Sequence, residues 1–402
     1  MATITSKLRT TVKQSKWLLP IILLSYFVVG FPDGAFTISW LGISADIPGM
    51  TTAHTGFILV AYSVTYTLAG ILLSWMNRYQ KLQHIYLGGL VIMGLGFIGL
   101  ALAPGFTVIL VTVAIYGLGT GMMASSMNAY MATHFTAKDN NWMHCFWGAG
   151  AAVSPMIMGH MMGVASWRMG YFVIVAFLGV IGVILLLSIY KKIWIDEAPE
   201  QMVSAQTKGT PRRYLTKKWH QVVEIGIFFF LGGTDYTLVF FTGAALIARG
   251  TETTYTVAIF SAVYYIGMTV GRMFFGWSAQ WLKENSIVRI GILLAIVGIG
   301  IVYVTGHVSG TALTGFGLGP LLPTLVSDTS NRFPPRKLAQ LVGYELAAFG
   351  AGIAILFFMT SQIMHFVSYE ALFGLGLVFV LLVFVANEIL VIALRKCQNQ
   401  PG

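Results

Sequence analysis

Hydrophobic residues recur along this chain in long runs, separated by short polar segments, from near the N-terminus to near the C-terminus. Most runs approach or exceed the roughly 20 apolar residues that a helix needs to cross a bilayer. The pattern therefore predicts twelve membrane-spanning helices. They are expected at residues 17–43, 54–76, 84–103, 106–133, 141–164, 167–190, 219–247, 255–279, 287–305, 309–328, 339–364 and 368–394.

The one long polar stretch, residues 191–218, separates the first six runs from the last six and mixes acidic with basic side chains. It is predicted to be a linker between two six-helix domains, residues 1–190 and 219–402. A shift of 202 residues superposes the runs of the two halves, which indicates a duplicated unit. The coinciding residues include Trp17 and Trp219, Trp75 and Trp277, Asp33 and Asp235, Gly30 and Gly232, and Gly150 and Gly352.

Composition supports the same class of protein. The chain is 56% hydrophobic and only 9% charged, which excludes an ordinary soluble surface. A basic start precedes the first run, as in a signal peptide, but the run is too long and no small-residue cleavage site follows it. The first run is therefore expected to be retained as a helix. Two cysteines make a disulfide framework improbable.

The net charge of +10 raises the alternative of a nucleic-acid-binding protein. The basic residues instead alternate with the helices: of the 24 Lys and Arg, 21 fall on the inner side of an N-inside arrangement. Arg168 and Arg249 are expected on the outer side, and Arg272 lies within the eighth predicted helix. This distribution follows the positive-inside rule, and basic loops on that side would meet anionic lipid. We therefore expect a multi-pass protein of the cytoplasmic (inner) membrane with both termini cytoplasmic and no nucleic-acid partner. Separately, a monomer is expected.

Several segments resemble the major facilitator superfamily, and within it the fucose-permease-like sugar:proton symporters. The segments that carry the likeness are residues 30–40, residues 117–128, residues 141–155, Ser166-Trp-Arg168 and Gly271-Arg272. The resemblance implies an all-α integral membrane fold, with twelve transmembrane helices in two pseudo-symmetric six-helix bundles.

The resemblance also implies a function. A secondary transporter with alternating access is expected, with proton-coupled symport of a small polar solute of the sugar class. Sodium is the alternative coupling ion. Because Gly150, Ser154 and Pro155 resemble a helix-5 motif of drug:proton antiporters, proton-driven export of drugs or metabolites is the alternative.

Ionisable side chains inside predicted helices are the candidates for proton coupling, since such groups are costly in a bilayer. Asp33 lies near the middle of the first helix beside Pro32, where a loosened helix would let it face a cavity. Asp235 lies at the same depth and would either titrate with Asp33 or bond the hydroxyls of a solute. His144 and Glu345 are further candidates, which could pair across the cavity in one conformation. For each, a structural hydrogen bond is the alternative.

The candidates for solute binding are polar or aromatic residues on helices that line the cavity in the superfamily, although helix packing and membrane anchoring explain such residues equally well. They are Asp235, Asn128, Trp40, Tyr62, Trp142, Trp147, Tyr264 and Tyr344. Arg78 and Arg272 are the expected gate residues. Glu224 is expected to be a solvated or gate residue, and Asp328 is expected at a helix end.

No enzyme activity and no cofactor are expected. The Cys and His residues lack metal-ligand spacing, and none of the glycine-rich segments is followed by the Lys-Ser/Thr of a phosphate-binding loop. The absence of a nucleotide-binding segment also argues against an ATP-driven pump. The expected partners are a small-molecule solute, a coupling ion and membrane lipid.

Overall fold

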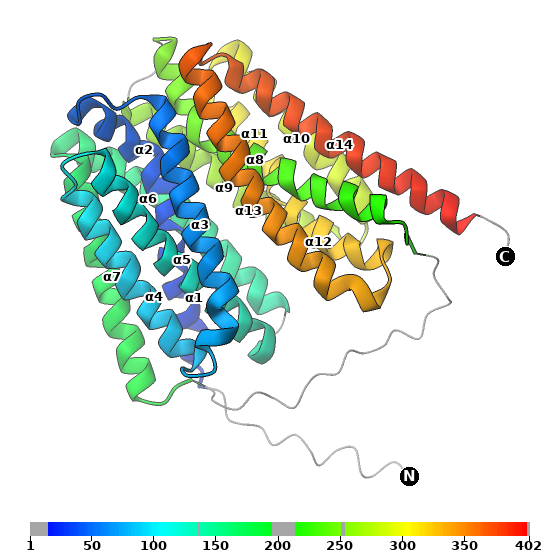
Figure 1. Cartoon of the computed structure of the whole chain (residues 1–402), viewed down its shortest axis with the longest axis horizontal. Helices are drawn as coiled ribbons and strands as arrows, with labels where there is room; N and C mark the ends of the chain where they lie inside the picture. The colour runs from blue at the N-terminus through cyan, green and yellow to red at the C-terminus, as the bar shows by residue number, and fades with distance from the viewer. Residues whose placement is uncertain (1–14, 136, 195–213, 251–253, 400–402) are drawn as a thin grey trace.

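The computed structural model describes residues 15–135, 137–194, 214–250 and 254–399. Within these residues the chain forms fourteen α-helices and no strand (Figure 1). The first half contains α1 Leu18–Val29, α2 Phe31–Asp46, α3 Thr52–Met76, α4 Leu82–Ala101, α5 Phe106–His134, α6 Ala137–Val164 and α7 Trp167–Tyr190. The second half contains α8 Lys218–Ala248, α9 Thr254–Ser278, α10 Glu284–Thr305, α11 Val308–Leu318, α12 Leu321–Arg332, α13 Pro335–Phe366 and α14 Ala371–Gln398.

The all-α fold with two related bundles is confirmed, with the difference that two of the twelve predicted helices are each broken in two. Helices α1 and α2 together form the first predicted span, and α11 and α12 form the tenth. Ten segments of the described residues are individually long and apolar enough to cross a bilayer. Helix α6 and the broken pair α11–α12 correspond to the other two predicted spans. Each member of that pair is too short to cross a bilayer alone.

Both breaks lie at a glycine followed closely by a proline. Gly30 ends α1, and Pro32 stands in the first turn of α2, where its missing N–H costs no helical hydrogen bond. Gly319 ends α11, and Pro320 precedes α12. A break frees backbone N–H and C=O groups in the middle of the bundle, and such ends can face charged groups there.

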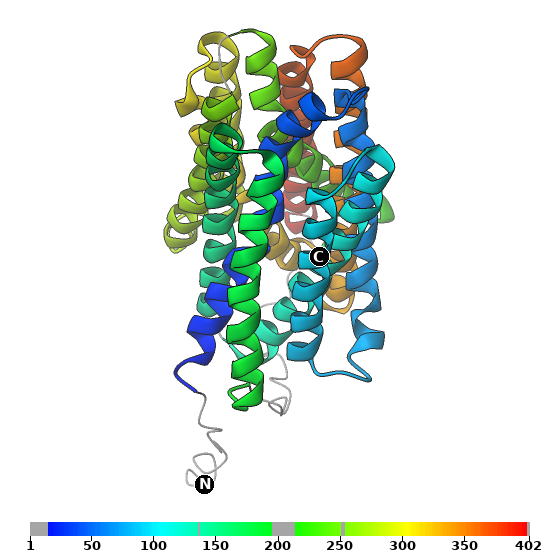
Figure 2. The same cartoon turned by 90° about the vertical axis from the view of Figure 1, so that its left-hand side faces the viewer.

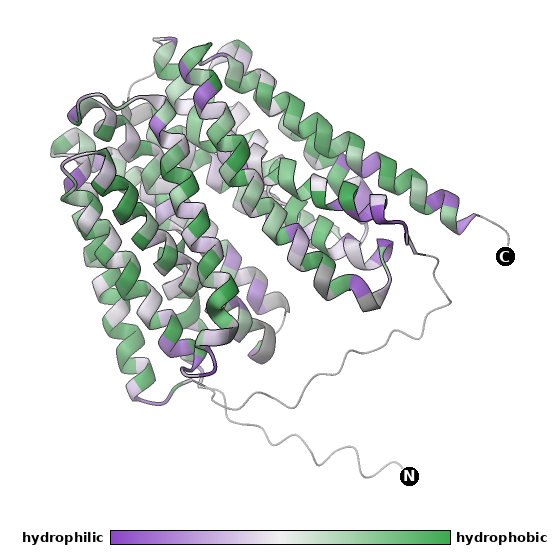
Figure 3. Ribbon diagram, viewed as in Figure 1, coloured by the Kyte–Doolittle hydropathy of each residue, from purple (hydrophilic) through white to green (hydrophobic). Residues whose placement is uncertain are grey.

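The helices of each half pack mainly on one another and run roughly along one direction (Figure 2). The two halves meet where α3 lies on α13 and where α6 lies on α9. Hydrophilic residues gather at the helix ends, while the helix bodies are largely hydrophobic (Figure 3). Residues 195–213 of the predicted linker and the basic residues among 1–14 lie outside the described residues.

Glycines allow the same close helix crossing in each half. A side chain at Gly150 in α6 would overlap the Phe27 carbonyl oxygen in α1, and one at Gly352 in α13 would overlap the Phe229 carbonyl oxygen in α8. Small residues let membrane helices approach to backbone contact, where packing stabilises them. The two contacts are related by the 202-residue shift seen in the sequence.

The two basic residues expected on the outer side make a matching clamp in each half. Arg168 at the start of α7 pairs with Asp46 at the end of α2 at 3.0 Å and donates to the Ala101 carbonyl oxygen at 2.9 Å. Arg249 after α8 pairs with Glu370 before α14 and donates to the Tyr303 carbonyl oxygen at 2.8 Å. The hydrogen bond from Arg249 holds the pKa of the Glu370 carboxyl below its usual value.

We call the end of the molecule where α7 ends and α8 begins the linker face. Side-chain contacts between the halves gather toward the opposite face. There, the Thr52 and Tyr369 hydroxyls are 2.6 Å apart, the Gln362 amide donates to the Ala53 carbonyl oxygen at 3.0 Å, and the rings of Phe57 and Phe358 meet edge to face. The helices of the two halves diverge toward the linker face (Figure 1). The chain is therefore closed at the face opposite the linker.

Candidate functional site

A pocket lies between the two halves, near the middle of the helices. Its polar lining comes from Asp33 and Thr37 of α2 and from tyrosines on four helices, and the rest is apolar. The lining residues are Pro32, Asp33, Phe36, Thr37, Leu59, Tyr62, Tyr116, Tyr236, Val239, Phe240, Tyr265 and Phe357. A site built from both halves of a repeat, at the depth of a broken helix, is the usual place for a transported solute.

Asp33 is the acidic residue of this pocket, and it links the two halves. It stands in the first turn of α2, where the free N–H groups of the helix end favour a negative charge. The Tyr236 hydroxyl of α8 donates a hydrogen bond to Asp33 Oδ1 at 2.8 Å. Because α2 and α8 belong to different halves, this contact depends on how the halves are placed.

Asp235 has a different environment, although the repeat places it at the equivalent position. It does not line the pocket, and the Tyr264 hydroxyl of α9, within the same half, donates a hydrogen bond to its Oδ1. Tyr264 is fully buried in this contact. The structure thus gives the two carboxylates separate tyrosine partners: Asp33 is bonded across the halves and Asp235 within one half.

Trp147 and Arg272 meet at the α6–α9 contact. The Arg272 guanidinium lies over the Trp147 ring at 5.3 Å, and Arg272 Nε donates to the Gly319 carbonyl oxygen at 3.0 Å. That carbonyl is freed by the break between α11 and α12. Trp147 also packs edge-on against the pocket residue Tyr265. Arg272 therefore ties the first half to the helix break in the second.

The expected meeting of His144 and Glu345 does not occur in this conformation. The His144 ring packs edge-on against Tyr26 of α1, with centroids 5.7 Å apart. Glu345 Oε1 lies 3.0 Å from the Thr329 hydroxyl of α12. Each side chain is held within its own half.

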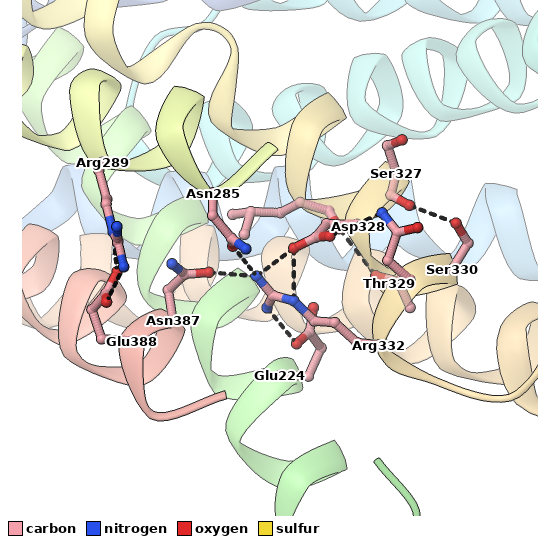
Figure 4. Close-up of polar contacts among 12 residues, drawn as sticks. Glu224, Asn285, Arg289, Ser327, Asp328, Thr329, Ser330, Arg332, Asn387 and Glu388 are labelled. Atoms are coloured by element: carbon pink, nitrogen blue, oxygen red, sulfur yellow. Dashed lines mark hydrogen bonds and ion pairs between the residues drawn. The ribbon is translucent and has the colours of Figure 1, made fainter. Parts of the chain in front are cut away.

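Through Thr329, Glu345 instead adjoins a group of buried ion pairs in the second half. Figure 4 shows these ion pairs around Arg332. Arg332 Nη1 lies 2.9 Å from Glu224 Oε2, and Nη2 lies 2.7 Å from Asp328 Oδ2. Asn285 and Asn387 also accept hydrogen bonds from this guanidinium. Glu224 is fully buried, so the expectation that it is solvated is wrong, and Asp328 pairs with the same guanidinium. We call Glu224, Asp328, Thr329, Arg332 and Glu345 the Arg332 cluster.

The other predicted site residues lie away from the pocket, except Tyr62, which lines it. Asn128 donates to the Tyr26 hydroxyl at 3.1 Å and so joins α5 to α1. Trp40 is buried in the core of the first half. Trp142 of α6 and Tyr344 of α13 are exposed near the linker ends of their helices, and Arg78 is exposed in the turn after α3.

Several pocket residues were missed from the sequence. Tyr236 and Tyr265 each directly follow a residue that was singled out, Asp235 and Tyr264, and one residue turns a helix by about 100°. Tyr116 precedes the glycine-rich segment of the fourth helix. The number of tyrosines on these helices could have indicated a polar pocket. The sequence does not say, however, which side of each helix faces that pocket.

The comparisons with known proteins agree with this architecture. A family model described as Major Facilitator Superfamily matches residues 22–313. The chain is 21% identical over 344 residues to "Bypass of stop codon protein 6" of Saccharomyces cerevisiae, covering 75% of this chain and 69% of that protein. It is also 21% identical over 310 residues to the glucose/mannose transporter GlcP of Bacillus subtilis, covering 74% of this chain and 76% of that protein.

Two solved structures show the same fold at low identity. The nucleoside transporter NupG matches with a TM-score of 0.72 at 11% identity, covering 92% of this chain and 99% of that one. A bacterial homologue of the human lysosomal transporter Spinster, in an inward-facing and unoccupied conformation, matches with a TM-score of 0.69 at 14% identity, covering 96% and 98%.

Proposed function

This chain belongs to the Major Facilitator Superfamily, and from that premise we propose that it is a secondary active transporter that moves a small polar solute of the sugar class together with protons. It is a multi-pass membrane transporter and not an enzyme. The observation that carries the proposal is the pocket between the halves, where the Asp33 carboxylate of one half accepts a hydrogen bond from Tyr236 of the other.

The Asp33–Tyr236 contact suggests how a proton and a solute are coupled. An ionised carboxylate accepts a charge-assisted hydrogen bond, which is about twice as strong as a neutral one. Protonation of Asp33 weakens the bond to Tyr236 and so changes the relative stability of conformations that differ in the placement of the halves. A solute that hydrogen-bonds the freed groups changes the same balance. Both ligands then bias one equilibrium, which is the condition for coupling.

A sugar-like solute fits the chemistry of the lining. Four tyrosine rings, on Tyr62, Tyr116, Tyr236 and Tyr265, offer apolar faces for a sugar ring. Their hydroxyls, together with Asp33, offer donors and acceptors for solute hydroxyl groups. The printed name of one relative, a glucose/mannose transporter, supports the same solute class.

The direction of coupled transport tests this proposal. We expect that adding the correct sugar to energised cells, or to proteoliposomes with the matching gradient, makes the outside more alkaline, because protons enter with the solute. The measurement is external pH during a screen of sugars, with empty liposomes as the control.

The alternative, proton-driven export of drugs or metabolites, is favoured by the apolar part of the same lining, which includes Phe36, Phe240 and Phe357. An exporter would leave host cells more resistant to toxic amphipathic compounds. Resistance without any sugar-induced pH change would replace sugar import by antiport.

We further propose the cytoplasmic membrane as the location, with the linker face toward the cytoplasm, as the positive-inside distribution indicates. Tags inserted in residues 191–218 and at both termini are then expected to react with an impermeant reagent only after the cells are opened. Labelling of any of the three tags in intact cells would contradict this orientation.

A further inference from the structure

We propose that Glu345 is a proton-binding site in the second half, separate from the pocket at Asp33, and that its proton is exchanged during the transport cycle. The exchange rests on the proposed proton-coupled function. The binding of the proton does not, because it follows from the contacts of the Arg332 cluster.

The Thr329 hydroxyl has two oxygen neighbours but only one hydrogen, which leaves room for a proton on Glu345. The Thr329 oxygen lies 3.1 Å from the Leu325 carbonyl oxygen and 3.0 Å from Glu345 Oε1. A threonine hydroxyl has one proton to donate but can also accept. Threonine hydroxyls in helices often donate to the carbonyl oxygen four residues earlier, which here is that of Leu325. If Thr329 does so, its contact with Glu345 is a hydrogen bond only when Glu345 Oε1 carries a hydrogen and donates it to the Thr329 oxygen.

The second oxygen of Glu345 supports the same assignment. Glu345 is fully buried, and its Oε2 has no hydrogen-bond partner among the described residues. An ionised carboxylate accepts through both oxygens, and a buried charge without partners is strongly unfavourable. A neutral acid leaves only a carbonyl oxygen unpaired, at a far smaller cost.

The charges that face Glu345 point the same way. They are Glu224 from α8 and Arg332 from α12, and Arg332 is also paired with Asp328. The single guanidinium of Arg332 is already in contact with Glu224 and Asp328, and it makes no ion pair with Glu345. Three ionised carboxylates around one guanidinium would leave excess negative charge in a buried site, and a proton on Glu345 reduces it.

The position of Glu345 on α13 connects this site to the conformational cycle. Toward the opposite face, α13 lies against α3 of the other half, where Phe358 meets Phe57. Near the linker face, the residues next to Glu345 are uncovered: Tyr344 is 51% and Leu346 50% exposed. Movement of one half against the other changes the surroundings of this segment, and with them the access of water to Glu345.

Infrared spectroscopy of the purified protein, without solute or gradient, tests the binding of the proton. We expect the carbonyl-stretching band of a buried protonated carboxylic acid near neutral pH, and we expect its loss in Glu345→Gln. The matched control is Glu388→Gln, which removes a glutamate of α14 that is ion-paired with Arg289. Should Glu345→Gln fail to fold, Thr329→Val is expected to shift the band, since it removes the hydrogen-bond partner of the acid.

Proton counting in proteoliposomes tests the exchange. Relative to the native protein, Glu345→Gln is expected to move one proton fewer per solute, while Glu388→Gln is unchanged. A band that is unaffected by Glu345→Gln and by Thr329→Val overturns the site. A band that belongs to Glu345 with an unchanged proton count overturns the exchange. If the native protein moves no protons at all while the band is present, the proposed function fails and the proton on Glu345 stands.

Discussion

Replacing Asp33 with asparagine is expected to lower accumulation of the solute against its gradient by at least tenfold while solute-for-solute exchange continues, because tenfold is what one lost proton costs per pH unit of gradient (about 1.4 kcal/mol). Asparagine resembles the protonated, neutral carboxyl but cannot release a proton, so both conformations of the transporter carry the same charge at this position. The proton gradient then has no difference in free energy on which to act at this position, and only the proton proposed at Glu345 still drives uptake. Uptake and counterflow, measured in the same proteoliposomes, separate the two activities.

The repeat supplies a matched control for Asp33→Asn. Asp235→Asn makes the same chemical change at the equivalent position, but Asp235 bonds Tyr264 and does not line the pocket. Coupled accumulation is expected to persist in this variant. Accumulation that survives Asp33→Asn and is lost in Asp235→Asn would move the coupling site to Asp235.

Replacing Arg332 with leucine is expected to lower the free energy of unfolding by about 3–5 kcal/mol, the cost of breaking a buried ion pair by removing one partner. Arg332 is 1% exposed, and its removal leaves Glu224 and Asp328 buried without a positive charge. Reversible denaturant unfolding in detergent micelles measures the change. Adding Glu224→Gln and Asp328→Asn to Arg332→Leu is expected to recover most of the loss.

A more exposed ion pair between two neighbouring helices serves as the control for Arg332. Arg289 of α10 and Glu388 of α14 lie 2.6 Å apart, but their side chains are 41% and 22% exposed (Figure 4). Water and screening weaken such a pair, so Arg289→Leu is expected to cost no more than about 1 kcal/mol. Equal losses of stability in Arg332→Leu and Arg289→Leu would mean that burial does not determine how much an ion pair contributes to the free energy of unfolding here.

The broken helices show how far local sequence signals reach. Pro32 and Pro320 were visible from the start, and a proline disturbs a helix wherever the chain places it. The role of each break was not visible, because it depends on what approaches the freed groups. At Gly319 the approaching group is Arg272, 47 residues away along the chain.

The pocket shows a second limit. Tyr62 was predicted for solute binding and lines the pocket, whereas Asn128 and Tyr264 were predicted on the same grounds and bond residues of their own half. Trp40, also predicted, is buried and does not line the pocket. In these segments nearly every position is apolar or aromatic, because lipid and protein interior are both apolar. The hydrophobic pattern that reveals the inner face of a helix in a soluble protein is therefore weak here.

By itself the sequence determined the membrane location of the helices, their approximate ends, the pairing of the two halves and the candidacy of Asp33. These features depend on the length of apolar runs, on the spacing of rare residues and on the cost of a charge in lipid, all of which are local or periodic along the chain. Only the tertiary structure decided the partners. Glu224, Asp328 and Asn387 were scattered polar residues until α8, α12 and α14 brought them around Arg332. The physical reason is that a buried charge is stabilised by contacts of a few ångströms, and the distance between residues on different helices is set by packing, which no pattern along one helix contains.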